Sequence, residues 1–216
     1  MRTRNRLLTI AGVAAAALAA AGLNTSAFAA TTLSSGHVDV LDSEWDGSAL
    51  HLHVHDEVTD TEYEPADVTL AVPAAAKVTN PGYGFLGTGS QVWLLPDTEA
   101  EATAAGVLFA GVSTEHLTTG TFAGDTVTYT LVSATRNGAS TEDFSVYSDA
   151  SGSVNRYFDS GSAANRSETF SVGADNHPNW AFEEAGTYRV TFTVRGTVGG
   201  TAVTSEQETL TFVVSG

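Results

Sequence analysis

The sequence feature that most constrains the fold is an alternation of apolar and polar residues with a period of two. It is clearest over residues 187–195, where every second residue from Tyr188 to Val194 is aromatic or β-branched. This pattern is typical of a strand with one buried face. No segment shows a sustained helical period, and turn residues recur at short intervals. We therefore predict an all-β fold of about eight to eleven strands, a single antiparallel β-sandwich that is immunoglobulin-like or jelly-roll-like.

The first 29 residues have the pattern of a secretory signal peptide. Three arginines stand among the first six residues, residues 7–23 are an almost unbroken apolar run, and residues 27–29 (Ala-Phe-Ala) form a small-x-small cleavage signal. A retained membrane anchor is the alternative, for which the apolar run is only marginally long. We expect cleavage after Ala29 and one secreted domain over residues 30–216, with no transmembrane segment in the mature chain.

The charge balance restricts the partners. The whole chain has a net charge of −16, and removal of the three leader arginines leaves −19. Such a surface repels phosphate backbones, so we expect no nucleic-acid partner, and it attracts cations. The alternative to a cation-binding role is that the acidic surface only keeps an exported protein soluble. The chain has no cysteine, so no disulfide stabilises it.

Histidine is concentrated in the first predicted hairpin. Residues 36–40 and 50–57 read as two strands joined by a turn. In the second strand His51, His53 and His55 alternate with leucine and valine. Half of the histidines of the chain therefore stand on one face of one short strand.

Two registers are open for this hairpin. If the numbers of opposed residues sum to 93, the histidines share a face with the valines of the first strand. A sum of 94 places Asp39 opposite His55 and Val40 opposite Val54 instead. We prefer the second register because it separates apolar from polar residues. It collects these polar residues on one face: His37, Asp39, His53 and His55.

Imidazoles on alternate strand residues can converge on one ion. Same-face neighbours stand roughly 6.5–7 Å apart, and neutral imidazole suits Zn, Cu, Ni or Fe. A carboxylate such as Asp39 would complete or orient such a set. A solvated, histidine-rich strand face is the alternative. His116 and His177 lie in predicted loops, and they matter only if the fold brings them to the same end of the sandwich.

Motifs for catalysis are absent from the sequence. It has no Gly-x-Ser-x-Gly elbow, no cysteine nucleophile and no EF-hand loop. Carboxylate pairs such as Glu183 and Glu184 read as solvated loop acids. We expect Trp45, Trp93 and Trp180 in the core rather than on a sugar-binding platform. A hydrolase is therefore the least favoured class.

Several segments follow one another in the order of a known family. On them the chain resembles the actinobacterial surface-anchored protein domain, also described as choice-of-anchor M, from about residue 35 to residue 214. The His-x-Asn-Trp-x-Phe block is the most specific part of the resemblance. The segments are Gly36–Val40, Tyr83–Gly87, Val92–Pro96, Gly111–Glu115, His177–Phe182 and Gly186–Tyr188.

The resemblance implies a non-enzymatic extracellular domain of cell-wall proteins, often encoded beside an ABC transporter. It also implies a relay of substrate from a surface receptor to that transporter, and such transporters resemble metal-uptake systems. Two departures matter. Many members carry His-x-His-x-Asn-Trp, whereas here Asp175 takes the first position and offers a harder ligand. No sortase signal or membrane tail follows residue 214, so we expect cell-envelope association without a wall anchor of its own.

The patterns and the resemblance together predict a secreted ligand-binding domain that is not an enzyme. We expect it to bind a transition-metal ion (Zn, Mn or Fe) or a metal complex. It would relay this ligand to the substrate-binding component of an ABC transporter or to another cell-surface protein. A structural or adhesive module that meets another protein or a glycan is the alternative. The predicted ligands are His37, Asp39, His53, His55 and His177, with His51, His116 and Asp175 as accessory ligands.

Overall fold

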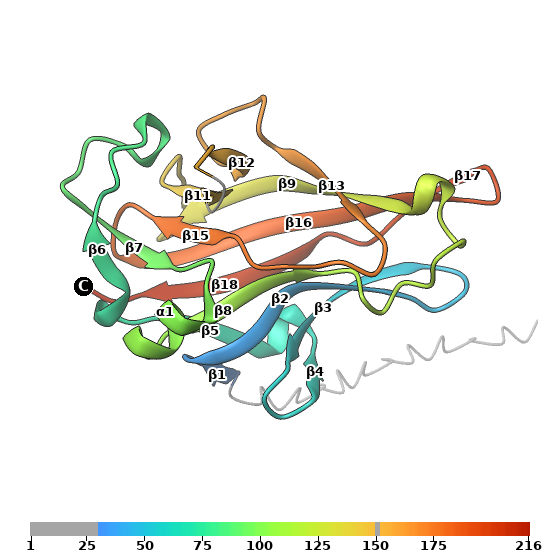
Figure 1. The fold of residues 1–216 in the computed structure, drawn as a ribbon, viewed down its shortest axis with the longest axis horizontal. Coiled ribbons are helices and arrows are strands. Elements are labelled where there is room, and N and C mark those ends of the chain that lie inside the picture. The colour runs from blue at the N-terminus through green and yellow to red at the C-terminus, as the bar shows by residue number, and fades with distance from the viewer. Residues whose placement is uncertain (1–29, 150–151) are drawn as a thin grey trace, which may run out of the picture.

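A computed structural model of the chain describes residues 30–149 and 152–216 (Figure 1). The predicted signal peptide, residues 1–29, lies outside the described residues. Within them the chain forms eighteen strands in three sheets and one α-helix. The expected all-β class is confirmed. The predicted number of strands was too low, because several strands have only two to four residues and no readable alternation.

The largest sheet, sheet A, contains the strands with the longest alternating runs. Its order is β1-β5-β18-β16-β9-β10, with β13 attached to β9 and β17 to β16. The bounds are β1 (Thr31–Leu33), β5 (Val68–Val72), β9 (Thr126–Arg136), β10 (Ala139–Ser140), β13 (Ser167–Ser171), β16 (Gly186–Val198), β17 (Thr201–Thr204) and β18 (Glu208–Val214).

Two five-stranded sheets complete the architecture. Sheet B has the order β14-β8-β2-β3-β4, and sheet C has the order β12-β11-β15-β7-β6. Sheet B comprises β2 (Gly36–Trp45), β3 (Leu50–Asp56), β4 (Thr61–Tyr63), β8 (Leu108–Ser113) and β14 (Asp175–Asn176). Sheet C comprises β6 (Lys77–Thr79), β7 (Gln91–Leu95), β11 (Phe144–Ser148), β12 (Asn155–Asp159) and β15 (Asn179–Phe182).

Helical structure is short and lies between strands. The acidic, alanine-rich stretch after Pro96 forms α1 (Glu99–Ala105). The Thr98 side chain accepts a hydrogen bond from the Glu101 amide, and Gly106 ends the helix in the left-handed conformation. No helix of the described residues is long and apolar enough to span a membrane. Four 3-10 turns occupy Pro65–Asp67, Ala74–Ala76, Gly84–Leu86 and Ala123–Asp125.

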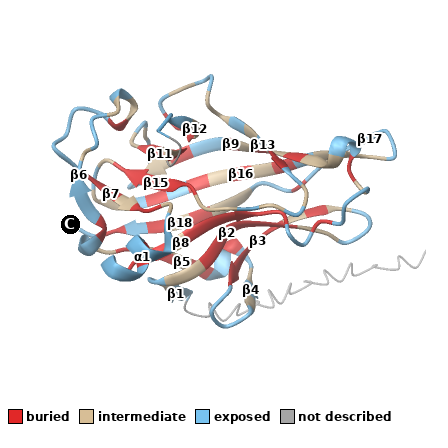
Figure 2. Cartoon of the chain, in the orientation of Figure 1, coloured by how far each residue is buried: buried red, intermediate tan, exposed pale blue. Residues whose placement is uncertain are grey.

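Sheets B and C pack against the same face of sheet A. Tyr129 of β9 reaches sheet B, where its hydroxyl lies 2.7 Å from Ser43 Oγ and 2.8 Å from Ser113 O. Phe212 of β18 packs against the rings of Trp180 and Phe182 in sheet C. One hydrophobic core therefore spans all three sheets, and all three tryptophans contribute to it or pack against it. Figure 2 shows these buried positions alternating along the strands.

The pairing is not wholly antiparallel, which corrects the predicted topology. β1 pairs with β5, β5 with β18, and β2 with β8 in parallel. A parallel pair joins segments that are far apart in the sequence, so no turn motif in the sequence predicts the pairing. The parallel pair of β2 and β8 lies at the centre of sheet B.

The C-terminal hairpin turns tightly. β16 continues to Val198, and a two-residue turn joins it to β17. Gly199 and Gly200 both have positive φ, 58° and 84°, as in the turns that suit tight hairpins. β17 and β18 lie on either side of Ser205, whose hydroxyl accepts a hydrogen bond from the Val194 amide.

The first hairpin follows the predicted register only at its open end. Asp39 faces His55, so these residue numbers sum to 94, but Asp42 faces His53 and the sum becomes 95. A β-bulge lies between the two pairs, and the expected pairing of Val40 with Val54 is not formed. The first strand is also longer than predicted, since β2 runs to Trp45 rather than to Val40. Because of the bulge, Asp39 and Asp42 both share the face of their histidine partners.

We predict that Tyr129→Phe lowers the free energy of unfolding by about 1–3 kcal/mol, because the buried Ser43 hydroxyl and Ser113 carbonyl lose a hydrogen-bond partner. Urea unfolding would show a lower midpoint with an unchanged slope. Tyr157→Phe is the matched control, since Tyr157 is only partly buried and packs at the edge of the core. Equal losses in both variants would contradict a linking role for Tyr129.

Candidate metal centre

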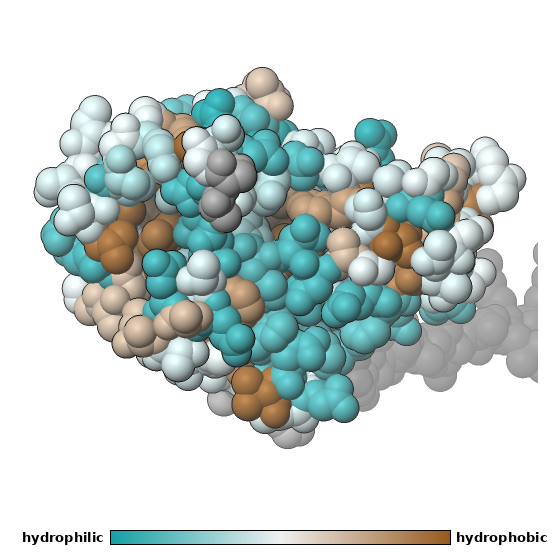
Figure 3. All heavy atoms as spheres, in the orientation of Figure 1, coloured by the Kyte–Doolittle hydropathy of each residue, from teal (hydrophilic) through white to brown (hydrophobic). Residues whose placement is uncertain are grey.

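All six histidines of the chain lie along sheet B and the segments beside it. The rings of His51 and His53 are 5.9 Å apart, those of His55 and His116 are 5.4 Å apart, and those of His37 and His177 are 4.5 Å apart. Hydrophilic side chains gather over β2, β3 and β8 in Figure 3. The fold thus brings both loop histidines to the histidine-bearing hairpin, as the sequence interpretation required.

This face is not simply solvated. His53 and His55 are 9 % and 8 % exposed, and Asp39 and Asp42 are 1 % and 0 % exposed. Figure 2 shows β2 and β3 as buried along most of their length. The alternative of an open, solvated histidine face therefore does not fit these four residues. Ionisable groups buried to this degree need partners.

The strand pairing places four of the candidate residues together. In β2, His37 and Asp39 point to the same face because they are two residues apart. Asp39 is the parallel partner of Gly111 in β8. On the other edge of β8, Asp175 pairs with Ser113 and Asn176 with Val112, so the chain brings His177 beside Gly111. The side chains of Asp39 and His177 therefore approach each other over Gly111, which lies between them in β8.

Gly111 provides the space in which they meet. A Cβ atom at this position would overlap the Asp39 carboxylate and lie 2.8 Å from His177 Cε1. The glycine has no left-handed backbone that would otherwise require it. Its role at this position is therefore to leave room for the two side chains.

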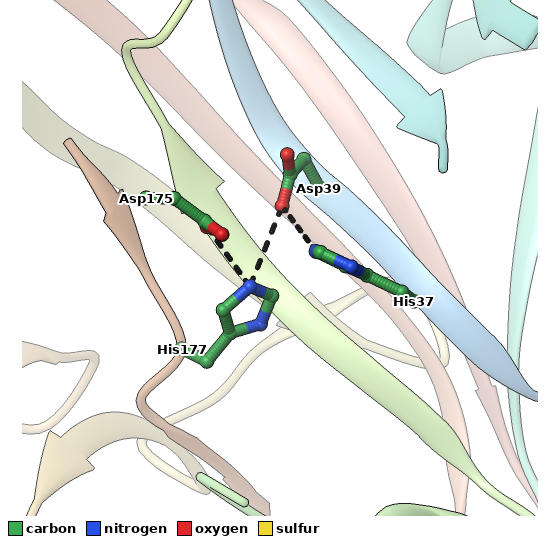
Figure 4. A group of neighbouring side chains, drawn as sticks. All are labelled: His37, Asp39, Asp175 and His177. Carbon is green, nitrogen blue, oxygen red and sulfur yellow. Dashed lines mark ion pairs between the residues drawn. The ribbon is translucent and has the colours of Figure 1, made fainter. Parts of the chain in front are cut away.

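The four side chains converge on one point, as Figure 4 shows. His37 Nε2 is 3.5 Å and His177 Nε2 is 3.9 Å from Asp39 Oδ1, and His177 Nε2 is 2.9 Å from Asp175 Oδ1. One donor atom from each residue lies within 4.8 Å of all the others. Two ligands of a tetrahedral ion with bonds of about 2.1 Å are roughly 3.4 Å apart. The observed separations bracket this value, so the group needs only small shifts to hold an ion.

Most of the converging atoms have no hydrogen-bond partner. His37 Nε2, Asp39 Oδ1 and His177 Nε2 are buried and have no hydrogen bond within the part of the chain that the structure describes, although both nitrogens lie at ion-pair distance from Asp39 Oδ1. Asp175 lies close to His177 but without hydrogen-bond geometry. A buried polar atom left without a partner costs about 1–3 kcal/mol. Several such atoms around one point indicate that a cationic partner belongs there.

The electrostatics of the group favour the same partner. Burial raises the pKa of Asp39 to about 8, and the nearby carboxylates of Asp175, Asp42, Glu57 and Glu115 add to this effect. Burial lowers the pKa of His177, although Asp175 opposes the shift. The imidazole is thereby kept in the neutral form that ligates metals, and a cation would relieve the repulsion among the carboxylates.

Phe109 fixes the orientation of both imidazoles. The His177 ring stacks on the Phe109 ring with centroids 3.7 Å apart and planes 10° apart. The His37 ring meets the edge of the same ring at 5.3 Å. An aromatic side chain of β8 thus holds two donor groups in place before any ligand arrives.

The other predicted residues lie further along the same face, in separate groups. His55 forms one group with Asp39 and Glu57 and another with Asp42 and His116. His53 lies with Glu44 and Glu62, at 3.7 Å and 3.4 Å from their carboxylate oxygens. His51 pairs with Asp46 at 3.1 Å in an exposed turn. The face therefore carries a row of polar groups rather than one group that includes His53.

Sequence reasoning missed Asp42 and Gly111. A signal for Asp42 is present, because the apolar pair Val40-Leu41 between two aspartates breaks the alternation and marks a bulge. Gly111 has no comparable signal. Its importance follows from the parallel pairing of β2 with β8, which local patterns do not reveal.

Comparison of the chain with protein-family models, with curated proteins and with solved structures found no match. The family resemblance therefore stays a prediction.

A second polar hollow lies against sheet C. Its lining includes Glu142, Asp143, Asp159, Glu183 and Arg156. Arg156 pairs with Asp159 at 2.7 Å, and Arg136 pairs with Asp143 at 2.9 Å. None of the metal-ligand groups of residues 30–149 and 152–216 includes these carboxylates. We interpret the hollow as a structural ion-pair network rather than a second candidate centre.

Glu183, which lines the same hollow, gives a prediction on pH. Burial raises its pKa from 4.5 to about 7, and neighbouring carboxylates contribute. The stability that the protonated group provides is complete below its unfolded pKa and is lost as pH rises through about 7. We expect Glu183→Gln to reduce the loss of stability between about pH 5 and about pH 8. Urea midpoints at both pH values would measure this, with the exposed neighbour variant Glu184→Gln as the control that follows the parent protein.

Proposed function

We propose that the protein is a non-enzymatic domain that binds a transition-metal ion through His37, Asp39, Asp175 and His177. The observation that carries the proposal is the convergence of one donor atom from each residue, of which His37 Nε2, Asp39 Oδ1 and His177 Nε2 are buried without a hydrogen bond. Three of their separations, 2.9, 3.5 and 3.9 Å, lie close to the distance between ligands around one ion, and the surrounding carboxylates supply negative charge. A purely structural hydrogen-bond network would pair these atoms with one another.

The donor set favours a transition metal over calcium or magnesium. Two imidazole nitrogens and two carboxylate oxygens form a mixed set, whereas calcium and magnesium prefer oxygen ligands alone. Zinc, manganese and iron all accept such a set. Four protein ligands would complete a tetrahedral ion, whereas catalytic zinc sites keep a position open for water or substrate. This supports a binding function rather than catalysis.

The site combines a fixed side with an open side. Asp39 and His177 are buried, while the side chains of His37 and Asp175 are each 30 % exposed. An ion could therefore reach and leave the site from the side of His37 and Asp175. Such access suits a domain that passes its ion to a partner, and the relay to an ABC transporter component implied by the resemblance belongs to this proposal.

We also propose that residues 1–29 direct export and are removed, so that the domain acts outside the cell or at its envelope. The first described strand begins at Thr31, two residues after the predicted cleavage site, which is compatible with removal of the leader. The immunoglobulin-like or jelly-roll-like class of the sandwich belongs to the same proposal.

Metal titration of the purified domain tests the site. At a free ion concentration 100-fold above the dissociation constant, we expect about 2.7 kcal/mol of stabilisation and a rise in melting temperature of roughly 5–10 °C. A chelator should reverse the rise in melting temperature. His177→Ala and Asp39→Asn should each abolish most of the shift for Zn²⁺, Mn²⁺ and Fe²⁺. His51→Ala, an exposed histidine outside the group, is the matched control and should keep the shift.

An equal shift in His177→Ala and the parent protein would overturn the proposal. The alternative of a structural or adhesive module would then be favoured, with the same polar face as its contact surface. Binding of a protein or glycan that is insensitive to chelator would support that alternative.

Gly111→Ala tests the geometry without removal of a ligand. The added methyl group would occupy the space of the Asp39 carboxylate, so we expect the metal-dependent shift in melting temperature to disappear. Gly84→Ala is the matched control, because a Cβ there meets no atom within 4 Å and Gly84 also lacks a positive φ. A Gly111→Ala variant that still binds metal like the parent would show that the ion does not sit between Asp39 and His177.

A further inference from the structure

A further group of three polar residues, which the proposed site does not use, lies on and beside sheet B. One donor atom each from Asp42, His55 and His116 lies within 4.8 Å of the other two. His116 Nδ1 is 2.8 Å from Asp42 Oδ2, and the His55 and His116 rings are 5.4 Å apart and tilted by 57°. The 2.8 Å contact and the 4.8 Å limit lie on either side of roughly 3.4 Å, the distance between two ligands of a tetrahedral ion, so small shifts would let the group hold an ion.

The bulge in β2 is what brings Asp42 into this group. In an unbroken strand, residues three positions apart point to opposite faces, so Asp39 and Asp42 could not both face the histidines of β3. The extra residue between the pairs Asp39–His55 and Asp42–His53 turns Asp42 to the histidine side. Bulges are found beside functional sites, where they re-aim a side chain in this way.

Asp42 is the most deeply buried carboxylate of the face. Its side chain is fully buried, and its Oδ1 atom has no hydrogen-bond partner among the described residues. Its only ion-pair partner in residues 30–149 and 152–216 is His116, with no lysine or arginine. A simple Asp–His pair would satisfy Oδ2 alone and would leave Oδ1 without a partner.

His55 and His116 complete a set with access to solvent. His55 Nδ1 is 2.8 Å from Glu57 Oε1 without hydrogen-bond geometry, and its Nε2 is 3.3 Å from Asp60 Oδ1. Carboxylates that hold one ring nitrogen while the other ligates are a regular feature of histidine metal sites. The His116 side chain is 46 % exposed, so an ion can reach the group from outside.

We propose that Asp42, His55 and His116 bind a second transition-metal ion, so that the face of sheet B holds two ions in neighbouring sites. The two sites share no ligand, and Asp39 of the first lies in one 4.8 Å group with His55 of the second. The second site stands on residues of its own and goes beyond the function proposed above. Its occupation would place two cations among the carboxylates that crowd this face.

The number of ions bound per chain at saturation tests this proposal. After equilibrium dialysis of the full domain against Zn²⁺, we expect two ions per chain in the parent protein and in His51→Ala. His116→Ala and His177→Ala should each bind one ion, and the double variant none. Asp42→Asn should also bind one ion, and His116→Ala provides the same test in an exposed residue if the buried substitution prevents folding. Far-ultraviolet circular dichroism would check that each variant is folded.

The outcomes separate the two proposals. One ion in the parent protein, kept in His116→Ala and lost in His177→Ala, would overturn the second site and leave the first. One ion that is lost in His116→Ala but kept in His177→Ala would overturn the first site and leave the second. Binding of two Cu²⁺ ions gives an independent readout, because magnetic coupling between them should broaden the electron paramagnetic resonance spectrum of the parent protein and of neither single variant.

Discussion

The burial of two carboxylates on one strand is the constraint on which the rest of the site depends. Asp39 and Asp42 are almost fully buried in β2, and histidines are their only ion-pair partners in the described chain. Charges buried without cationic partners are costly. Three features around them reduce this cost. A bulge turns both side chains to one face, a glycine leaves space for Asp39, and imidazoles approach the carboxylate oxygen atoms. A pair of cations would answer it most fully.

The sandwich behind sheet B supplies the rigidity that such a site needs. Tyr129 joins the back of sheet B to sheet A through Ser43, the residue next to Asp42. Trp180 donates from its ring nitrogen to the Ala110 carbonyl at 3.2 Å, and Ala110 lies between Phe109 and Gly111. The aromatic residues near His177 in the sequence therefore hold the strand that shapes the site, while the histidine itself faces the ligand atoms. Core packing and site geometry depend on the same short segment of β8.

Local patterns in the sequence were sufficient for the strand class, the first hairpin and its polar face. The alternation from Tyr188 to Val194 follows directly from period two, and the pairing of Asp39 with His55 follows from the register that separates apolar from polar residues. The bulge after Asp39 was missed because a one-residue insertion leaves only a weak trace, the Val40-Leu41 pair. The parallel pairing of β2 with β8 and the approach of His177 to His37 depend on long-range packing, for which a single sequence has no periodic signal. The sequence allowed Asp175 and His177 to be proposed as ligands. It did not show that they meet His37 and Asp39 rather than His53 and His55.

The parallel pair of β2 and β8 has a consequence for when the site comes into existence. Its ligands come from the first described strands and from a segment near the other end of the domain, so the unfolded chain holds them far apart. Contacts between residues so far apart in the sequence form late in folding, because the entropy cost of closing the loop comes before the stabilisation from core packing. The affinity for the ion would then belong to the finished fold alone. On the proposal that residues 1–29 direct export, a chain still in extended form during export would carry no ion with it, and the choice of metal would be made in the compartment where folding ends.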